Sequence, residues 1–490
     1  MATQKFVGVE TEYGIAVDGP TEVNPVLASS MVVGAHRRAS PSDVGWDHTD
    51  EQPMRDARGF ESAVVADPDA GLANTVLTNG ARFYVDHAHP EYATPECSNA
   101  LDLVRWDKAG ERILADAARR AAADLAPGGR VLIHKNNTDG KGAAYGTHEN
   151  YLVPRDVPFG RLTQALLPFF VSRSVFVGAG RLGTEFDEEV PFQLSQRADF
   201  FEVEIGLETT LKRPLMNTRD EPHADPARFR RLHVINGDAN LCEVATYLKV
   251  GTMMIVLDAI EDEAVDAPVE LRDPVHAFQV FSHDPTLRAT AETVDGQHVT
   301  ALDLQDAYLQ GCRRYVDARA GAAPVVDDVL DRWECVLGDA RRDPGSLSGR
   351  VDWATKLELI DGYASRHGLD WDSDRLRMVD LQYHDVREDR GLYQRLVARG
   401  RVERLVTDAQ VTDAMVRPPE DTRAWFRGEC IRRFSGEVVA AGWDALVFDT
   451  GRDTLQRVPM MDPSKGTRET TEALFDGVSS AAQLLDRLTD

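Results

Sequence analysis

Two glutamates, Glu10 and Glu12, stand one residue apart in the segment VGVETEYG. Alternate residues of a strand share a face, so the two carboxylates point the same way, about 6–7 Å apart. An edge strand with a solvated face explains such a pair, because ionised carboxylates are rarely buried without a partner. The pair also suits two adjacent divalent cations, since Mg²⁺ is usually held by a few carboxylates together with phosphate oxygens.

The segment NGARFYVDHAHPEYATPEC repeats this arrangement on a second predicted strand. There Arg82, Tyr84 and Asp86 fall on one face, and Glu91 follows shortly after them. A salt-bridged strand face and a functional face explain this pattern about equally well. A cation, a phenol and a carboxylate in register are nevertheless harder to attribute to a solvated face than the two glutamates alone.

A glycine-rich turn and an arginine-rich region add further polar groups. In HKNNTDGKGAAYGTHENY the turn precedes His148, which offers a metal or phosphate contact, although a polar surface loop explains the segment equally well. Between residues 207 and 240, arginine forks suited to phosphate and carboxylate groups stand near two histidines. This region predicts an anion or nucleotide site made of Arg213, Arg219, Arg230, Arg231, His223 and His233.

The composition limits the partners and the compartment. A net charge of −26 argues against a nucleic-acid partner, because no overall positive field is available to neutralise phosphates. Five scattered cysteines without a CxxC pair indicate reduced thiols, and the first residues contain no leader-like apolar run, so we expect a cytoplasmic protein. The most apolar stretch, residues 250–260, is too short to span a membrane and predicts a buried helix.

The order of the predicted elements suggests how these residues are positioned. Strands are expected at 5–17 and 81–87, an irregular polar stretch between them, and a helix at about 101–125. From residue 243 the chain becomes helical, and WDALVFDTGRDTLQRV predicts a hairpin before a terminal helix at about 469–488. Pro418 and Pro419 mark a boundary between a large domain, 1–417, and a small C-terminal domain, 418–490.

No serine or cysteine nucleophile motif accompanies the polar strands, which favours metal-assisted phosphoryl or acyl chemistry with a nucleotide. The motifs VGVETEYG, NGARFYVDHAHPEYATPEC, KNNTDGKGAAYGTHENY, NTRDEPHAD and RRLHVINGDAN, in this order, resemble the family of Pup-modifying enzymes. The resemblance covers essentially the whole chain. It implies an α+β fold with a glutamine-synthetase-like curved antiparallel sheet packed with helices, a small C-terminal α/β domain, and a flexible loop insertion at about 37–74.

Within that family the chain resembles the hydrolase branch, because the long segment around GWDHTDEQPMRDARGFE looks like an insertion that the ligase branch lacks. The spelling VGVETEYG is closer to the ligases, but both glutamates are kept. The resemblance implies deamidation of the C-terminal glutamine of the ubiquitin-like protein Pup and cleavage of the Pup–lysine isopeptide bond, with ATP and Mg²⁺ as cofactors. The partners would be Pup and pupylated proteins, and we expect a monomer.

The resemblance also assigns roles. Asp86 matches the catalytic aspartate, acting as a base toward water or as a nucleophile on the amide. Glu10, Tyr84 and Glu91 match magnesium ligands. With the residues singled out above, the expected metal ligands are Glu10, Glu12, Tyr84, Glu91, His148 and His233. The expected nucleotide contacts are Arg82, Thr94, Arg219, Arg231 and Trp443.

Three other functions stay open at this point. A Pup ligase would form the isopeptide bond through a γ-glutamyl phosphate. A small-molecule carboxylate–amine ligase of the glutamine-synthetase type would consume ATP with glutamate alone. A non-catalytic Pup-binding adaptor is the least favoured, since a scaffold does not require carboxylates and a tyrosine in this arrangement.

Overall fold

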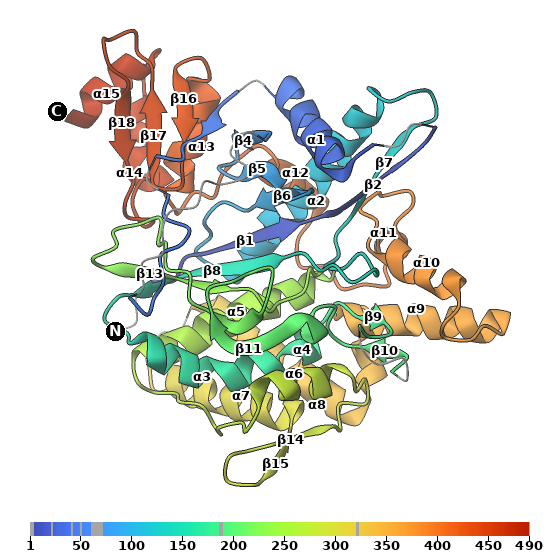
Figure 1. The fold of residues 1–490 in the computed structure, drawn as a ribbon. Coiled ribbons are helices and arrows are strands. Elements are labelled where there is room, and N and C mark those ends of the chain that lie inside the picture. Colours follow the sequence, from blue (N-terminus) through green and yellow to red (C-terminus); the bar gives the residue numbers. More distant parts are fainter. Residues whose placement is uncertain are drawn as a thin grey trace.

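The computed structural model describes residues 4–20, 23–40, 43–49, 51–59, 72–185, 190–319 and 323–489. Its centre is an open six-stranded sheet in which every neighbouring pair of strands is antiparallel (Figure 1). The strands, in spatial order, are β13 (Phe229–Val234), β8 (Thr147–Pro154), β1 (Val7–Glu12), β6 (His89–Ala93), β5 (Arg82–Asp86) and β4 (Asn74–Val76). The predicted strand at 81–87 is therefore confirmed as β5.

The predicted strand at 5–17 is divided in two. After β1 the chain continues as β2 (Gly14–Asp18), which leaves the central sheet and pairs antiparallel with β7 (Arg130–His134). Tyr13, between the two strands, is fully buried. The division bends the chain away from the sheet just beyond Glu12.

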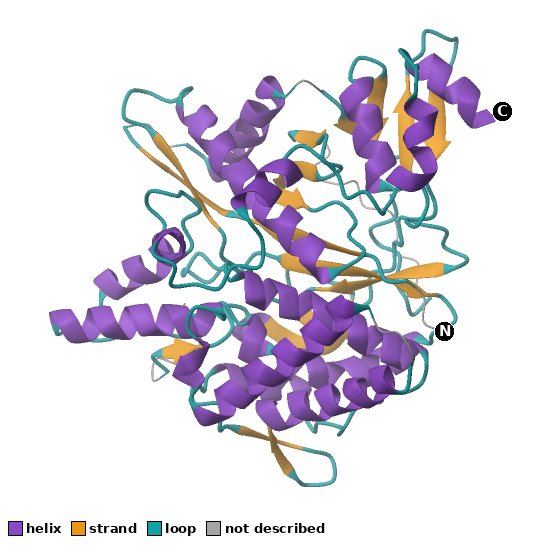
Figure 2. Ribbon diagram, turned by 180° about the vertical axis from the view of Figure 1, so that it is seen from behind, coloured by secondary structure: helices purple, strands orange, loops and turns teal. Residues whose placement is uncertain are grey.

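One face of the central sheet is apolar and packs on helices. Val7, Val9, Tyr151 and Val153 stand at alternate positions along β1 and β8, and they belong to one large hydrophobic core. Helix α2 (Ala100–Ala122) crosses the sheet on the side seen in Figure 2, and it confirms the helix predicted at about 101–125. Helix α5 (Glu243–Glu261) is buried along nearly its whole length, as predicted for residues 250–260, because it is apolar on almost every side.

Further helices follow along the chain, and α3, α6, α7 and α8 lie on the lower side of Figure 1. The further helices are α3 (Phe159–Ser172), α4 (Ser174–Val177), α6 (Pro274–Ser282), α7 (Ala301–Asp317), α8 (Pro324–Arg342), α9 (Asp352–His367), α10 (Asp374–Tyr383), α11 (Leu392–Ala398) and α12 (Asp408–Ala414). Short strand pairs join them: β9 (Arg181–Leu182) with β10 (Phe192–Gln193), β11 (Phe201–Gly206) with β12 (Arg213–Asn217), and β14 (Thr290–Glu292) with β15 (His298–Thr300). Among the described residues, no helix combines the length and the apolar character needed to cross a membrane.

The end of the chain forms a second, smaller sheet, seen in red and orange in Figure 1. It contains β16 (Val438–Ala441), β17 (Ala445–Phe448) and β18 (Gln456–Pro459), packed on α13 (Ala424–Arg433). The predicted hairpin is confirmed, since β17 and β18 pair antiparallel around the TGRD turn. The fourth strand comes from the other end of the chain: β3 (Gly45–Trp46) pairs parallel with β16. The boundary at residue 418 stays a prediction.

Two predictions for irregular and terminal segments need correction. A single helix at 469–488 is wrong: α14 (Arg468–Thr471) and α15 (Ala481–Thr489) are separated by a 3₁₀ turn and a bend at Gly477, whose φ of 67° is left-handed. The stretch predicted as a loop at about 37–74 begins in the last turn of α1 (Pro25–Ala39) and contains β3. Within it, residues 41–42, 50 and 60–71 lie outside the described part of the chain.

Candidate active site

The central sheet brings the predicted metal ligands to one face, opposite the apolar core. Residues directly across an antiparallel pair share a face. Glu12 stands opposite Glu91, and Glu91 stands opposite Tyr84. On the other side of β1, Glu10 stands opposite His148. Local alternation and strand register together therefore explain why residues so far apart in the sequence meet.

Three carboxylates form a compact cluster on this face. Glu12, Asp86 and Glu91 each place an oxygen within 4.8 Å of the other two. Burial, and then the negative charge of Asp86, raise the pKa of Glu91 well above its ordinary value. The Tyr84 hydroxyl donates a hydrogen bond of 2.6 Å to Glu91 Oε1. Buried carboxylates that repel one another in this way fit a divalent cation, which prefers oxygen ligands.

A second donor set lies beside the first. Glu10 Oε1 is 3.4 Å from Nδ1 of His148 and 3.3 Å from Nε2 of His233. Burial raises the pKa of Glu10, but hydrogen bonds from the two imidazoles outweigh it and bring the pKa well below its ordinary value. Burial lowers the pKa of His233, which keeps its imidazole in the neutral form that binds metals. These three groups lie close enough to hold one ion.

Asp86 ends β5 at the tip of a tight hairpin, and its side chain is about one-third exposed. Its carboxylate lies 2.9 Å from Nδ1 of His87. His89, which stands opposite Asp86 in the hairpin, lies 3.1 Å from Glu12 and stacks on Tyr145. The sequence reasoning missed His87 and His89, although strand alternation through a two-residue turn already places His89 on the face of Asp86.

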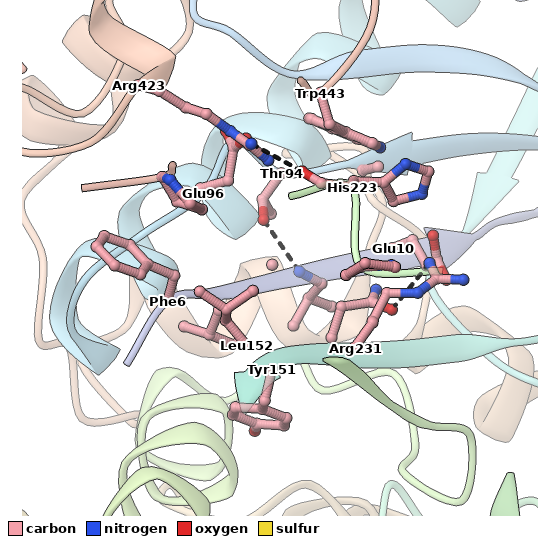
Figure 3. Close-up of a pocket in the computed structure, with 17 residues that line it drawn as sticks. Phe6, Glu10, Thr94, Glu96, Tyr151, Leu152, His223, Arg231, Arg423 and Trp443 are labelled. Atoms are coloured by element: carbon pink, nitrogen blue, oxygen red, sulfur yellow. Dashed lines mark hydrogen bonds and ion pairs between the residues drawn. The ribbon is translucent and has the colours of Figure 1, made fainter. Parts of the chain in front are cut away.

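A pocket opens between the central sheet and the C-terminal unit, which is the second, smaller sheet with its helix α13 (Figure 3). Three predicted nucleotide contacts line it, namely Thr94, Arg231 and Trp443. Phe6 and Leu152 add an apolar wall on the sheet side, and the sequence reasoning did not identify them. A pocket lined by a tryptophan, apolar side chains and an arginine suits an aromatic base that carries phosphates.

Trp443 is held in place by buried charges. Its backbone oxygen accepts a hydrogen bond of 3.0 Å from Arg427, whose guanidinium lies 5.0 Å from the indole ring. Arg427 also pairs with Glu96, which binds Arg423 at 2.6 Å. Burial raises the pKa of Glu96, but the two arginines outweigh it and lower the pKa to about 2. The C-terminal unit is thus anchored to the chain segment that follows β6.

Arg82 does not line this pocket. Its guanidinium lies between two aromatic rings, 4.0 Å from Trp46 and 3.9 Å from Tyr84. Trp46 in turn makes an edge contact with Trp443, with 5.2 Å between ring centroids. Arg82 therefore connects the metal-ligand face to the wall of the pocket through Trp46, a residue that the sequence reasoning did not select.

The predicted cluster of four arginines is wrong in part. Arg230 and Arg231 are neighbours on β13, so they point to opposite faces, and Arg230 lies over Phe159 instead. Arg213 donates hydrogen bonds to the backbone oxygens of Thr209 and Ala144.

Arg219 and Arg231 lie near one another and near the carboxylates of the metal-ligand face. The pKa of Arg219 is lowered by burial and by the charge of Arg231, while Glu10 opposes this shift. Both guanidinium groups have a buried Nε without a hydrogen-bond partner in the described part of the chain. Buried donors of this kind fit an anion such as a phosphate.

Comparison with known proteins gives a consistent result. The family model described as "Pup-ligase protein" matches residues 5–447. The chain is 54% identical over 499 residues to the depupylase of Acidothermus cellulolyticus, covering 99% of each protein. It is 50% identical over 499 residues to the Pup deamidase/depupylase of Mycolicibacterium smegmatis, covering 99% of this chain and 100% of the relative.

Two solved structures share the fold. One is the complex between Pup and its ligase PafA, with a TM-score of 0.81 and 31% identity, covering 99% of this chain and 94% of that one. The other is PafA in complex with ADP, with a TM-score of 0.73 and 34% identity, covering 82% of this chain and 89% of that one. The mixed α+β architecture is thereby confirmed.

Proposed function

We infer that this chain, which belongs to the Pup-ligase protein family, is a Pup deamidase/depupylase. The observation that carries this conclusion is the identity of 50–54% over essentially the full length of relatives with that activity. The two Pup ligases of known structure reported above are 31% and 34% identical. As such an enzyme, the chain hydrolyses the side-chain amide of the C-terminal glutamine of Pup and the isopeptide bond between Pup and a lysine.

The nucleotide is proposed to be ATP, bound in the pocket between the sheet and Trp443. Trp443 and the apolar wall would take the base, Thr94 would contact the bound nucleotide, and Arg219 and Arg231 would face the phosphates. The unpartnered guanidinium nitrogens support this assignment, and a related ligase has been solved with ADP. Arg82 would act through Trp46, since it does not line the pocket.

The metal is proposed to be Mg²⁺, held by Glu12 and Glu91 in one set and by Glu10, His148 and His233 in the other. Tyr84 hydrogen-bonds Glu91, and its role as a ligand stays a prediction. A bound cation would neutralise phosphate oxygens and polarise a carbonyl group. The repulsion that raises the pKa of Glu91 supports this assignment, because a cation would relieve it.

Asp86 is proposed as the catalytic residue. It lies on the metal-ligand face and is partly exposed at the hairpin tip, so a substrate amide can approach its carboxylate. As a base it would take a proton from the attacking water; as a nucleophile it would attack the amide carbon directly. In both roles the carboxylate must be ionised and aimed at the same carbon. Pup is proposed to reach the site as a segment that orders on binding.

A paired assay tests the function. Pup ending in glutamine should lose its terminal amide as ammonia when ATP and Mg²⁺ are present, and a Pup–lysine conjugate should be cleaved. Pup ending in glutamate, mixed with a lysine substrate, should give no conjugate. Formation of a conjugate would indicate a ligase, and consumption of ATP with glutamate alone would indicate a small-molecule ligase.

The Asp86→Asn variant is the control for the catalytic residue. It should bind ADP as the wild type does and keep the same unfolding midpoint, because the substitution preserves size. Its hydrolysis of both Pup substrates should be lost. Turnover near that of the wild type would contradict the role of Asp86, while leaving the substrate assignment intact.

A further inference from the structure

The hairpin between β5 and β6 contains a backbone conformation that its sequence does not favour. His87, directly after Asp86, has a φ of 52°. This left-handed region is adopted freely by glycine, whereas a β-carbon makes it unfavourable, although histidine is found there more often than most residues. A glycine would suit the turn better, so the side chain of His87 needs another reason to be there.

Burial does not provide that reason. The side chain of His87 is 57% exposed. By comparison, the neighbouring His89 is only 23% exposed, with its ring stacked on Tyr145 and paired with Glu12. An exposed side chain on a strained backbone is a pattern found at functional sites.

One contact of His87 is with the proposed catalytic carboxylate. Its Nδ1 lies 2.9 Å from Oδ2 of Asp86. An ionised carboxylate only accepts hydrogen bonds, so Nδ1 carries the proton and donates it. Within the described part of the chain, His87 is the only residue that hydrogen-bonds the Asp86 carboxylate.

Asp86 needs such a partner because its other neighbours repel it. Oxygens of Glu12 and Glu91 lie within 4.8 Å of an Asp86 oxygen. The terminal torsion of an aspartate has a broad minimum, so this repulsion can turn the carboxylate away from the cluster and toward solvent. A hydrogen bond from the adjacent residue opposes that rotation.

We propose that His87 is a positioning residue for the hydrolysis of Pup: its Nδ1–H holds the Asp86 carboxylate in the orientation that reaches the substrate amide. This inference rests on the proposed function. The left-handed backbone at His87 is what directs its imidazole back toward the preceding residue. The strain is thus the cost of placing a donor beside the reactive carboxylate.

Two substitutions at His87 test the proposal. His87→Gly removes the donor and suits the backbone, so the melting temperature should not fall. The kcat for Pup deamidation should fall about 10- to 100-fold, as is typical when a group that orients an active-site ligand is removed, with an unchanged KM and ADP affinity. His87→Asn tolerates the left-handed backbone and keeps an N–H donor, so it should recover much of the lost kcat.

Glu263→Gly is the matched control. Glu263 also has a positive φ, 57°, and lies just beyond α5, where it pairs with Arg161 at an exposed site. This variant should keep full activity. A His87→Gly enzyme with kcat equal to the wild type would overturn the positioning role alone, as would an Asn variant as slow as the Gly variant. An inactive wild type would instead overturn the proposed function on which the inference rests.

Discussion

Replacing Glu91 by glutamine should stabilise the metal-free protein. Glutamine keeps the size of the side chain and the oxygen that accepts the Tyr84 hydroxyl, but it removes one of three neighbouring negative charges. At a separation of 4.8 Å and an effective dielectric constant of about 20, each pair of carboxylates repels by about 3.5 kcal/mol. Solvent near Asp86 and proton uptake by the cluster relieve most of this repulsion. We therefore expect the variant to gain about 1–2 kcal/mol in its free energy of unfolding at pH 8.

The gain should depend on pH in a defined direction. The pKa of Glu91 is raised in the folded protein, by burial and then by the charge of Asp86, so the folded state holds a proton that the unfolded state has lost above about pH 4.3. Its contribution to stability is therefore fully present below about pH 4.3 and is lost as the pH rises through the folded pKa. Glu91→Gln lacks this loss, so its advantage over the wild type should grow with increasing pH.

Urea unfolding in EDTA and in Mg²⁺ provides the assay. In EDTA the variant should unfold at a higher urea concentration than the wild type. In Mg²⁺ the wild type should gain about 2.7 kcal/mol at a cation concentration 100 times its Kd, whereas the variant should gain far less. Glu204→Gln, an exposed glutamate on β11, is the control and should change little. If Glu91→Gln is less stable than the wild type in EDTA, or gains equally from Mg²⁺, the three carboxylates do not share a cation site.

Three further predictions concern the pocket and its anchor. Trp443→Ala should weaken ADP binding about 10- to 100-fold in calorimetric titration, since stacking on a base contributes about 1–3 kcal/mol; unchanged affinity would remove the tryptophan from the site. Glu96→Gln should cost about 3–5 kcal/mol at pH 7, because it leaves two buried arginines unpaired. Burial raises the pKa of Glu96, but its arginine partners outweigh burial and lower the pKa to about 2. The difference in stability between the wild type and the variant should therefore shrink as the pH falls from about 4.3 to about 2. Equal unfolding curves at pH 7 would contradict the pairing. Arg231→Ala should weaken ADP binding most at low salt, whereas Arg230→Ala, on the other face of β13, should not; equal effects would refute the assignment of faces.

The sequence was most informative where a single local rule applies. The period of two residues along a strand placed Glu10 with Glu12, and Tyr84 with Asp86, before any strand pairing was known. The same rule, applied to β13, would have separated Arg230 from Arg231. The single helix predicted at 469–488 missed the bend at Gly477, a glycine that adopts a left-handed conformation.

Long-range register was not accessible in the same way. The contact between His89 and Glu12 depends on how β6 pairs with β1, and nothing near either residue specifies that register. Trp46 is the clearest case, since it reaches the pocket wall only because a two-residue strand pairs with β16. Which strands and side chains meet depends on the free energy of the whole packed structure. A short stretch of sequence does not carry that information.

The pairing of β3 with β16 also determines when the site can form. Gly45 and Ala440 are nearly 400 residues apart, so their contact has to wait until almost all of the chain has left the ribosome. Until then Trp46 cannot contact Trp443, and the pocket lacks the wall that Trp443 forms. The nascent protein therefore has no complete pocket in which a bound ligand could stabilise its own first half.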